Sequence, residues 1–122
     1  MASINREPVA LEFGGNTYRV KPSFRVIDAI EQRIGLAVVA NRLQIGDVRV
    51  SDLAWFIFSA LSSQGIKDFE YYEVGEVIVS TKGGIAKAAD FAGRLIEAAL
   101  DTGPEEPLDD EGDGAGDSEG KG

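Results

Sequence analysis

The residues of this chain that could do chemistry are carboxylates, because its 122 residues include no histidine and no cysteine. Imidazole general bases, thiolate nucleophiles, disulfides and the usual zinc ligand sets are therefore excluded. Paired carboxylates, such as Glu73 with Glu76 or Glu105 with Glu106, could in principle carry out acid–base catalysis. Nothing near them in the sequence supplies a second catalytic group, so solvated surface acids are the simpler interpretation. We expect no catalytic residue, no cofactor and no enzyme activity.

Two short motifs resemble ligand-binding loops. From Asp109 onward, acids stand at the calcium-loop positions 1, 3, 5 and 9, and Gly114 stands at position 6. Position 12, which needs a bidentate glutamate, is Gly120, and no predicted helix flanks the loop, so we expect no metal site. Gly83 and Gly84 precede a predicted helix and could offer N–H groups to an anion. A connection between two helices explains that glycine pair more simply.

The net charge of −9 lies almost entirely in the C-terminal part of the chain. Residues 101–122 contain nine acids and one base, whereas residues 1–100 hold 12 acids and 11 bases and carry a net −1. A basic patch for nucleic acid or an anionic membrane is not predicted in either part. Beyond residue 101 glycine and acids dominate, so we expect a disordered acidic tail at 102–122.

The apolar run at 53–61 predicts a buried helix, since it is much shorter than the roughly 20 residues needed to span a bilayer. At 100° per residue, one face carries most of its large apolar side chains: Leu53, Phe56, Ile57, Ala60 and Leu61. Trp55 and Phe58 fall on the other side. Either the hairpin or the last helix covers these two rings, or they form a protein-binding patch that Tyr71 and Tyr72 extend.

Other elements follow from periodicity and from stop signals. Residues 9–13 and 17–21 alternate as strands around the turn Gly14-Gly15-Asn16, which predicts a β-hairpin. Besides the helix at 53–61, helices are predicted over 24–34, 36–43, 69–81 and 85–100. Ser23, Ser51 and Asp68 are the expected N-caps of the helices at 24–34, 53–61 and 69–81. Gly35 and Gly65 are expected to end the helices at 24–34 and 53–61. Within 69–81, β-branched residues favour a strand, but we expect a helix with Tyr72, Gly75, Ile78 and Val79 on one side.

The fold class predicted is α+β and mostly helical, with the N-terminal hairpin packed on a bundle of about four helices. Residues 1–8 are expected to be a flexible arm and residues 9–101 the folded domain. The start of the chain has no apolar stretch of signal-peptide length, so secretion by that route is not expected.

The order of these motifs resembles a known family. The hairpin sequence Leu-Glu-Phe-Gly-Gly-Asn-Thr-Tyr is followed by Glu-Gln-Arg-Ile-Gly at 31–35, Val-Ser-Asp-Leu-Ala at 50–54 and Leu-Ile-Glu-Ala-Ala-Leu at 95–100. This pattern, over about residues 7–100, resembles the gene-transfer-agent type of phage tail protein, grouped with the tail assembly chaperones of long-tailed phages.

The resemblance implies a small cytoplasmic helper of tail morphogenesis that acts by binding, without ATP or metal. Its partners would be the long, apolar, helical tape-measure protein and the tail-tube subunits; a homo-oligomer is left open. Trp55, Phe58, Tyr71 and Tyr72 are the candidate partner-binding residues. Two other classes stay open: a structural tail subunit, for instance of the tube, that is retained in the particle, and a small cytoplasmic protein-interaction module unrelated to phage.

Overall fold

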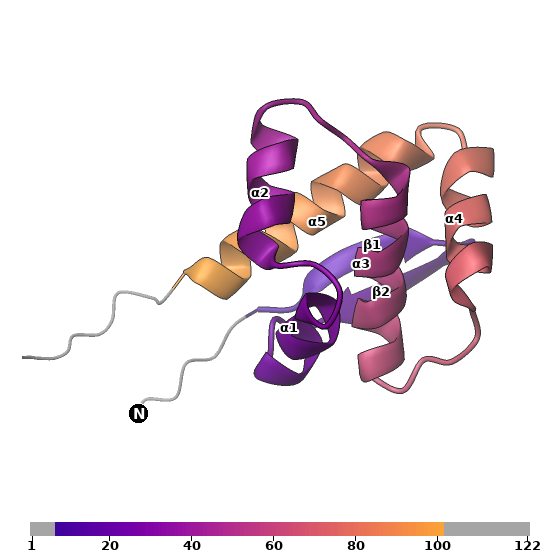
Figure 1. The fold of residues 1–122 in the computed structure, drawn as a ribbon. Coiled ribbons are helices and arrows are strands. Elements are labelled where there is room, and N and C mark those ends of the chain that lie inside the picture. Colours follow the sequence, from indigo (N-terminus) through magenta and orange to yellow (C-terminus); the bar gives the residue numbers. More distant parts are fainter. Residues whose placement is uncertain (1–6, 102–122) are drawn as a thin grey trace, which may run out of the picture.

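A computed structural model describes residues 7–101 of the chain (Figure 1). The elements in order are β1 (Val9–Phe13), β2 (Asn16–Val20), α1 (Phe24–Glu31), α2 (Leu36–Gln44), α3 (Val50–Ser63), α4 (Tyr71–Ser80) and α5 (Gly84–Leu100). The predicted fold class, a hairpin packed on helices, is confirmed. The predicted acidic tail, the calcium-like motif within it and all but the last two residues of the predicted arm lie outside the described residues.

The two strands form an antiparallel hairpin closed by a two-residue turn. Phe13 pairs with Asn16 and Val9 with Val20. Asn16 was predicted to lie in the turn, but it is the first residue of β2. Gly14 and Gly15 have φ values of +59° and +83°. Positive φ at both central positions is the type I′ geometry that matches the twist of a hairpin, and glycine adopts it without a steric penalty.

Helix α3 lies at the centre of the fold. It contacts α1 on one side and α4 on the other, and α5 packs behind it (Figure 1). The face predicted from its periodicity is buried: Leu53, Phe56, Ile57, Ala60 and Leu61. The apolar side chains of α5 are likewise buried at Ala88, Phe91, Ala92, Leu95 and Ile96. The two helices meet edge to face at Phe56 and Phe91, whose ring centroids are 6.2 Å apart.

The helix starts agree only in part with the predicted caps. Ser23 caps α1 as predicted, because its hydroxyl accepts a hydrogen bond from the Val26 N–H. The Ser51 cap is wrong: α3 begins at Val50, so the cap position is Arg49, two residues before Ser51, and it makes no side-chain cap. Gly35 does not end α1, which stops at Glu31; it stands in the N-cap position of α2 instead.

Helix α4 is confirmed as a helix despite its β-branched residues, but its start and its buried face differ from the prediction. Glu70 and Glu73 form a reciprocal capping box, so the Asp68 cap is wrong. The face turned inward carries Val74 and Ile78, which are fully buried. Of the predicted face, Tyr72 and Val79 are exposed, because α4 is rotated so that Val74 meets the core.

Candidate functional site

The four aromatic residues singled out from the sequence lie next to one another on α3 and α4. The Trp55 ring is 5.6 Å from Phe58 and 6.1 Å from Tyr71, centroid to centroid. Phe58 and Tyr71 are 6.4 Å apart, and Tyr72 packs edge to face on Tyr71 at 5.2 Å. We call these four side chains the aromatic cluster. The contact between α3 and α4 is therefore what joins residues that are separated in the sequence.

The end of α1 holds the cluster in place. The indole N–H of Trp55 donates a 3.1 Å hydrogen bond to the carbonyl oxygen of Ile30, the last but one residue of α1. The guanidinium carbon of Arg33 lies 5.3 Å from the centre of the Trp55 ring and 5.5 Å from that of Tyr71. Both distances are within the range of cation–π attraction. Arg33 was not predicted, because no spacing rule connects it with residues on other helices.

A shallow groove of about 650 Å³ extends from the cluster between α1 and α3. Trp55 and Phe58 line it together with polar side chains, including Arg25, Asp28 and Lys67. Phe24, the first residue of α1, also lines the groove and is 82% exposed. Helix α1 turns Val26 and Ile30 into the core and leaves Phe24 at the surface.

The aromatic cluster is neither fully covered nor fully exposed, the two alternatives that the sequence left open. Trp55, Phe58 and Tyr71 are half-buried, whereas Tyr72 is 83% exposed. The ring contacts of Trp55 come from α3 itself, from Arg33 after α1 and from α4; neither the hairpin nor α5, the two covers expected, provides one. The rings therefore pack against the domain on one side and reach its surface on the other.

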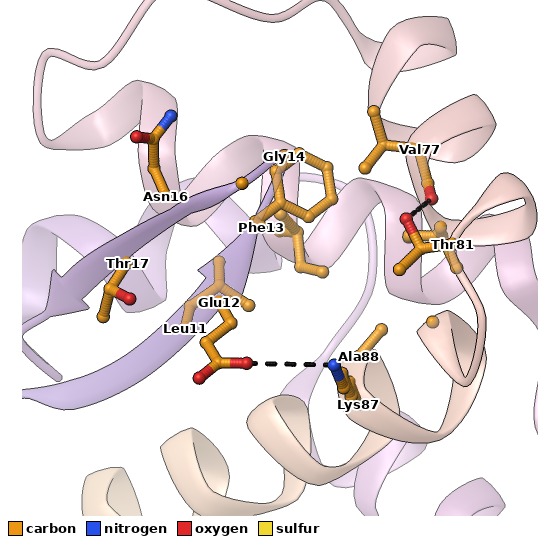
Figure 2. A pocket seen from close by; sticks show the side chains of 14 residues that line it. Leu11, Glu12, Phe13, Gly14, Asn16, Thr17, Val77, Thr81, Lys87 and Ala88 are labelled. Atoms are coloured by element: carbon orange, nitrogen blue, oxygen red, sulfur yellow. Dashed lines mark hydrogen bonds and ion pairs between the residues drawn. The ribbon is translucent and has the colours of Figure 1, made fainter.

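A second hollow, of about 410 Å³, lies between the hairpin, α4 and α5 (Figure 2). Its lining is mostly apolar or glycine. On one side the Glu12 carboxylate faces the Lys87 ammonium group at 3.8 Å, and on another the Thr81 hydroxyl donates to the Val77 carbonyl oxygen (Figure 2). Its charged side chains are thus paired with each other, and its lining brings together no nucleophile and general base.

The two shortest ion pairs within residues 7–101 lie at the connection of α2 to α3, apart from both hollows. Arg42 bonds Asp52 at 2.6 Å, which ties α2 to α3. The Arg49 guanidinium donates two hydrogen bonds to the Asp47 carboxylate, of 3.2 and 2.9 Å. These bonds, with the charge of the guanidinium, hold the pKa of Asp47 below its ordinary value of 3.8 and raise the pKa of Arg49. Both pairs have structural roles here.

Within residues 7–101, no group of three or more acidic, histidine or cysteine residues is placed to hold a metal ion. None of the helices in that range is both long and apolar enough to cross a membrane. Comparison with models of protein families, with curated proteins and with solved structures found no match to this chain. The feature that the structure offers for function is a surface of aromatic rings with a cation over them, an arrangement suited to binding another protein.

Proposed function

We propose that this chain is a tail assembly chaperone that binds an apolar helical segment of a tape-measure protein in the cytoplasm of the host cell. In this proposal it also brings tail-tube subunits to the growing complex. The aromatic cluster is the observation that carries the proposal, because it places four aromatic rings at one surface of a small domain. The resemblance over residues 7–100 supports the choice of partner.

The shape of the surface supports a helix as the bound segment. The groove between α1 and α3 is shallow and is lined by three aromatic rings, those of Phe24, Trp55 and Phe58. An amphipathic helix binds such a groove by inserting apolar side chains spaced three, four and seven residues apart. Binding would remove the exposed faces of Phe24 and Tyr72 from water, which is favourable.

The charges around the cluster support a partner with acidic residues beside its apolar stripe. Arg33 forms no ion pair with any residue among 7–101, and its guanidinium stacks over Trp55 and Tyr71. Arginine is enriched at the energetic centres of protein interfaces together with tryptophan and tyrosine. A partner carboxylate that reached Arg33 would pair with it bidentately, and the rings would shield this pair from water.

The test is co-expression with the candidate tape-measure protein, followed by pull-down and a measured dissociation constant. The double variant Phe58→Ala/Tyr72→Ala should bind at least about tenfold more weakly, because two aromatic contacts are lost. Trp55 is left intact, since its hydrogen bond to Ile30 also supports the fold. The matched control is Ile45→Ala, which removes a side chain that is 69% exposed after α2, outside the groove and the cluster.

Unchanged binding in the double variant, with full binding by the control, would show that the cluster is not the tape-measure site. No binding by the wild-type chain would overturn the proposal itself. Mass spectrometry of purified particles separates a chaperone from a structural subunit, because a chaperone is absent from the finished particle and a tube subunit is abundant.

A further inference from the structure

Among residues 7–101, nothing bonds the outward backbone groups of β1, whereas the outer edge of β2 is partly covered. The Gln64 side chain accepts a hydrogen bond from the Lys21 N–H and donates one to the Arg19 carbonyl oxygen, at 2.9 and 3.1 Å. The backbone of Arg19 therefore points away from β1. In an antiparallel ladder, a residue and its partner across the strands point outward together. Ala10, which pairs with Arg19, thus turns its own N–H and C=O to the outer edge of β1.

No residue among 7–101 bonds these outward groups of Ala10, nor those of Glu12 two residues along. An unpaired strand edge is a template on which a further strand can add. Beside this edge runs a groove of about 420 Å³ between β1 and α5, lined by Ala10 and Glu12 on the strand side. The Glu12–Lys87 ion pair bridges the strand and the helix there (Figure 2).

The exposed face of α5 beside this groove carries a charge pattern that is complementary to itself. Its charged residues are, in order, Lys87, Asp90, Arg94 and Glu97, all exposed and within about 80° of the helix surface. Within one chain, Asp90 and Arg94 bond each other at 3.2 Å. When a second copy of α5 is laid antiparallel to the first, every cation of one helix lies opposite an anion of the other. Two copies of α5 laid antiparallel about position 92 would therefore pair Lys87 with Glu97 of the other copy, and Asp90 with Arg94 of the other copy.

The strand edge and the helix face share the same centre. Lys87 contacts Glu12, and Ala10 lies two residues, or about 7 Å, back along β1. Since β1 and α5 run in opposite directions (Figure 1), that shift corresponds to between four and five residues along α5, at about 1.5 Å each. In agreement with this estimate, Ala10 lines the same groove as Asp90, Phe91 and Arg94, which surround position 92 of α5. A single two-fold axis through Ala10 can therefore relate both the β1 edges and the charged faces of α5 in two copies of the chain.

We infer that two copies of this chain associate through β1 and α5 as a symmetric dimer. Ala10 pairs with Ala10 of the second copy, which joins the two hairpins into one four-stranded antiparallel sheet. The α5 helices lie antiparallel over its centre and exchange their four ion pairs. Such an interface is isologous, as most dimer interfaces are. The aromatic cluster contributes no residue to it, so it is independent of the proposed function.

Charge reversal with the full chain tests the helix contact, with sedimentation velocity as the measurement. In a dimer of Lys87→Glu, the new glutamate of each copy faces Glu97 of the other, which gives two repulsive pairs. Glu97→Lys likewise gives two repulsive pairs, with Lys87. Each variant should therefore dimerise at least about tenfold more weakly than the wild type. An equal mixture of the two variants should restore dimers, because each chain then faces the opposite charges of the other. Glu76→Lys, the same change on the exposed face of α4, is the control and should leave dimerisation unaltered.

Proline tests the strand contact. Ala10→Pro removes the outward N–H at the proposed centre without breaking a hydrogen bond within the hairpin, so the variant should be folded and monomeric. Thr17→Pro, at an outward position of the opposite edge, is the matched control and should still dimerise. A monomeric wild-type chain at high concentration would overturn the inference. So would dimers in Ala10→Pro, or a charge-reversal mixture that associates no better than its components.

Discussion

Gly84 is the position where the packing of α4 on α5 leaves no room for a side chain. A Cβ atom built there would overlap the carbonyl oxygen of Ile78 and would lie 3.1 Å from both the Ile78 carbonyl carbon and the Thr81 Cβ. The Gly84 N–H donates a 2.8 Å hydrogen bond to the Thr81 carbonyl oxygen, so the start of α5 is held against the end of α4. Gly84→Ala therefore forces these two helices apart.

The size of the effect follows from what must move. Overpacking typically costs about 1–3 kcal/mol, and the atom in the way here is a backbone oxygen, which cannot rotate aside as a side chain can. Alanine recovers only part of its helix propensity at the first position of a helix. We expect the free energy of unfolding to fall by about 3 kcal/mol. For a domain of this size, the melting temperature should fall by roughly 15 °C.

Thermal and urea denaturation followed by circular dichroism measure this loss. Gly93→Ala is the matched control: Gly93 lies within the same helix and has nothing within 4 Å of a built Cβ. It should gain about 0.5–1 kcal/mol, because alanine favours the helix and restricts the unfolded chain. If Gly84→Ala is as stable as the wild type, the close contact of α5 with Ile78 does not exist. If both variants lose stability equally, the contact is not the cause.

The other predictions concern a strand edge and a pKa. Gln64→Ala should lower the free energy of unfolding in urea by about 1 kcal/mol, because it loses two hydrogen bonds, one to Arg19 in β2 and one to Lys21 just after it. Gln44→Ala, at the exposed end of α2, should change this free energy by less than about 0.5 kcal/mol, and equal losses in the two variants would refute the role of Gln64. By NMR titration, the carboxyl pKa of Asp47 should lie below 3.8 and rise in Arg49→Gln. In the wild-type chain, the Asp47–Arg49 pair stabilises the fold above pH 3.8, and this stabilisation is lost as the pH falls through the lowered pKa of Asp47. An unshifted pKa of Asp47 would contradict this.

The elements that could be predicted from the sequence are those whose signals are local. The hairpin follows from alternation around a glycine pair, and the buried faces of α3 and α5 follow from helical spacing. The Ser23 cap and the positive φ of Gly65 involve neighbours within a few residues. In each of these cases the physical cause acts within one turn or one hairpin, so the residue types suffice to reveal it.

Tertiary packing decided the rest. Helix α4 has apolar residues on two sides, and contact with α3 selected Val74 for the core and left Tyr72 at the surface. The same contact brought Trp55, Phe58 and Tyr71 together, and the path of the chain after α1 placed Arg33 over them. Trp55 and Phe58 could be named from the sequence because they fall outside the apolar face of one short helix, and Tyr71 and Tyr72 because they follow it closely. Their arrangement could not, because it depends on the distances between helices, which periodicity within a helix does not encode.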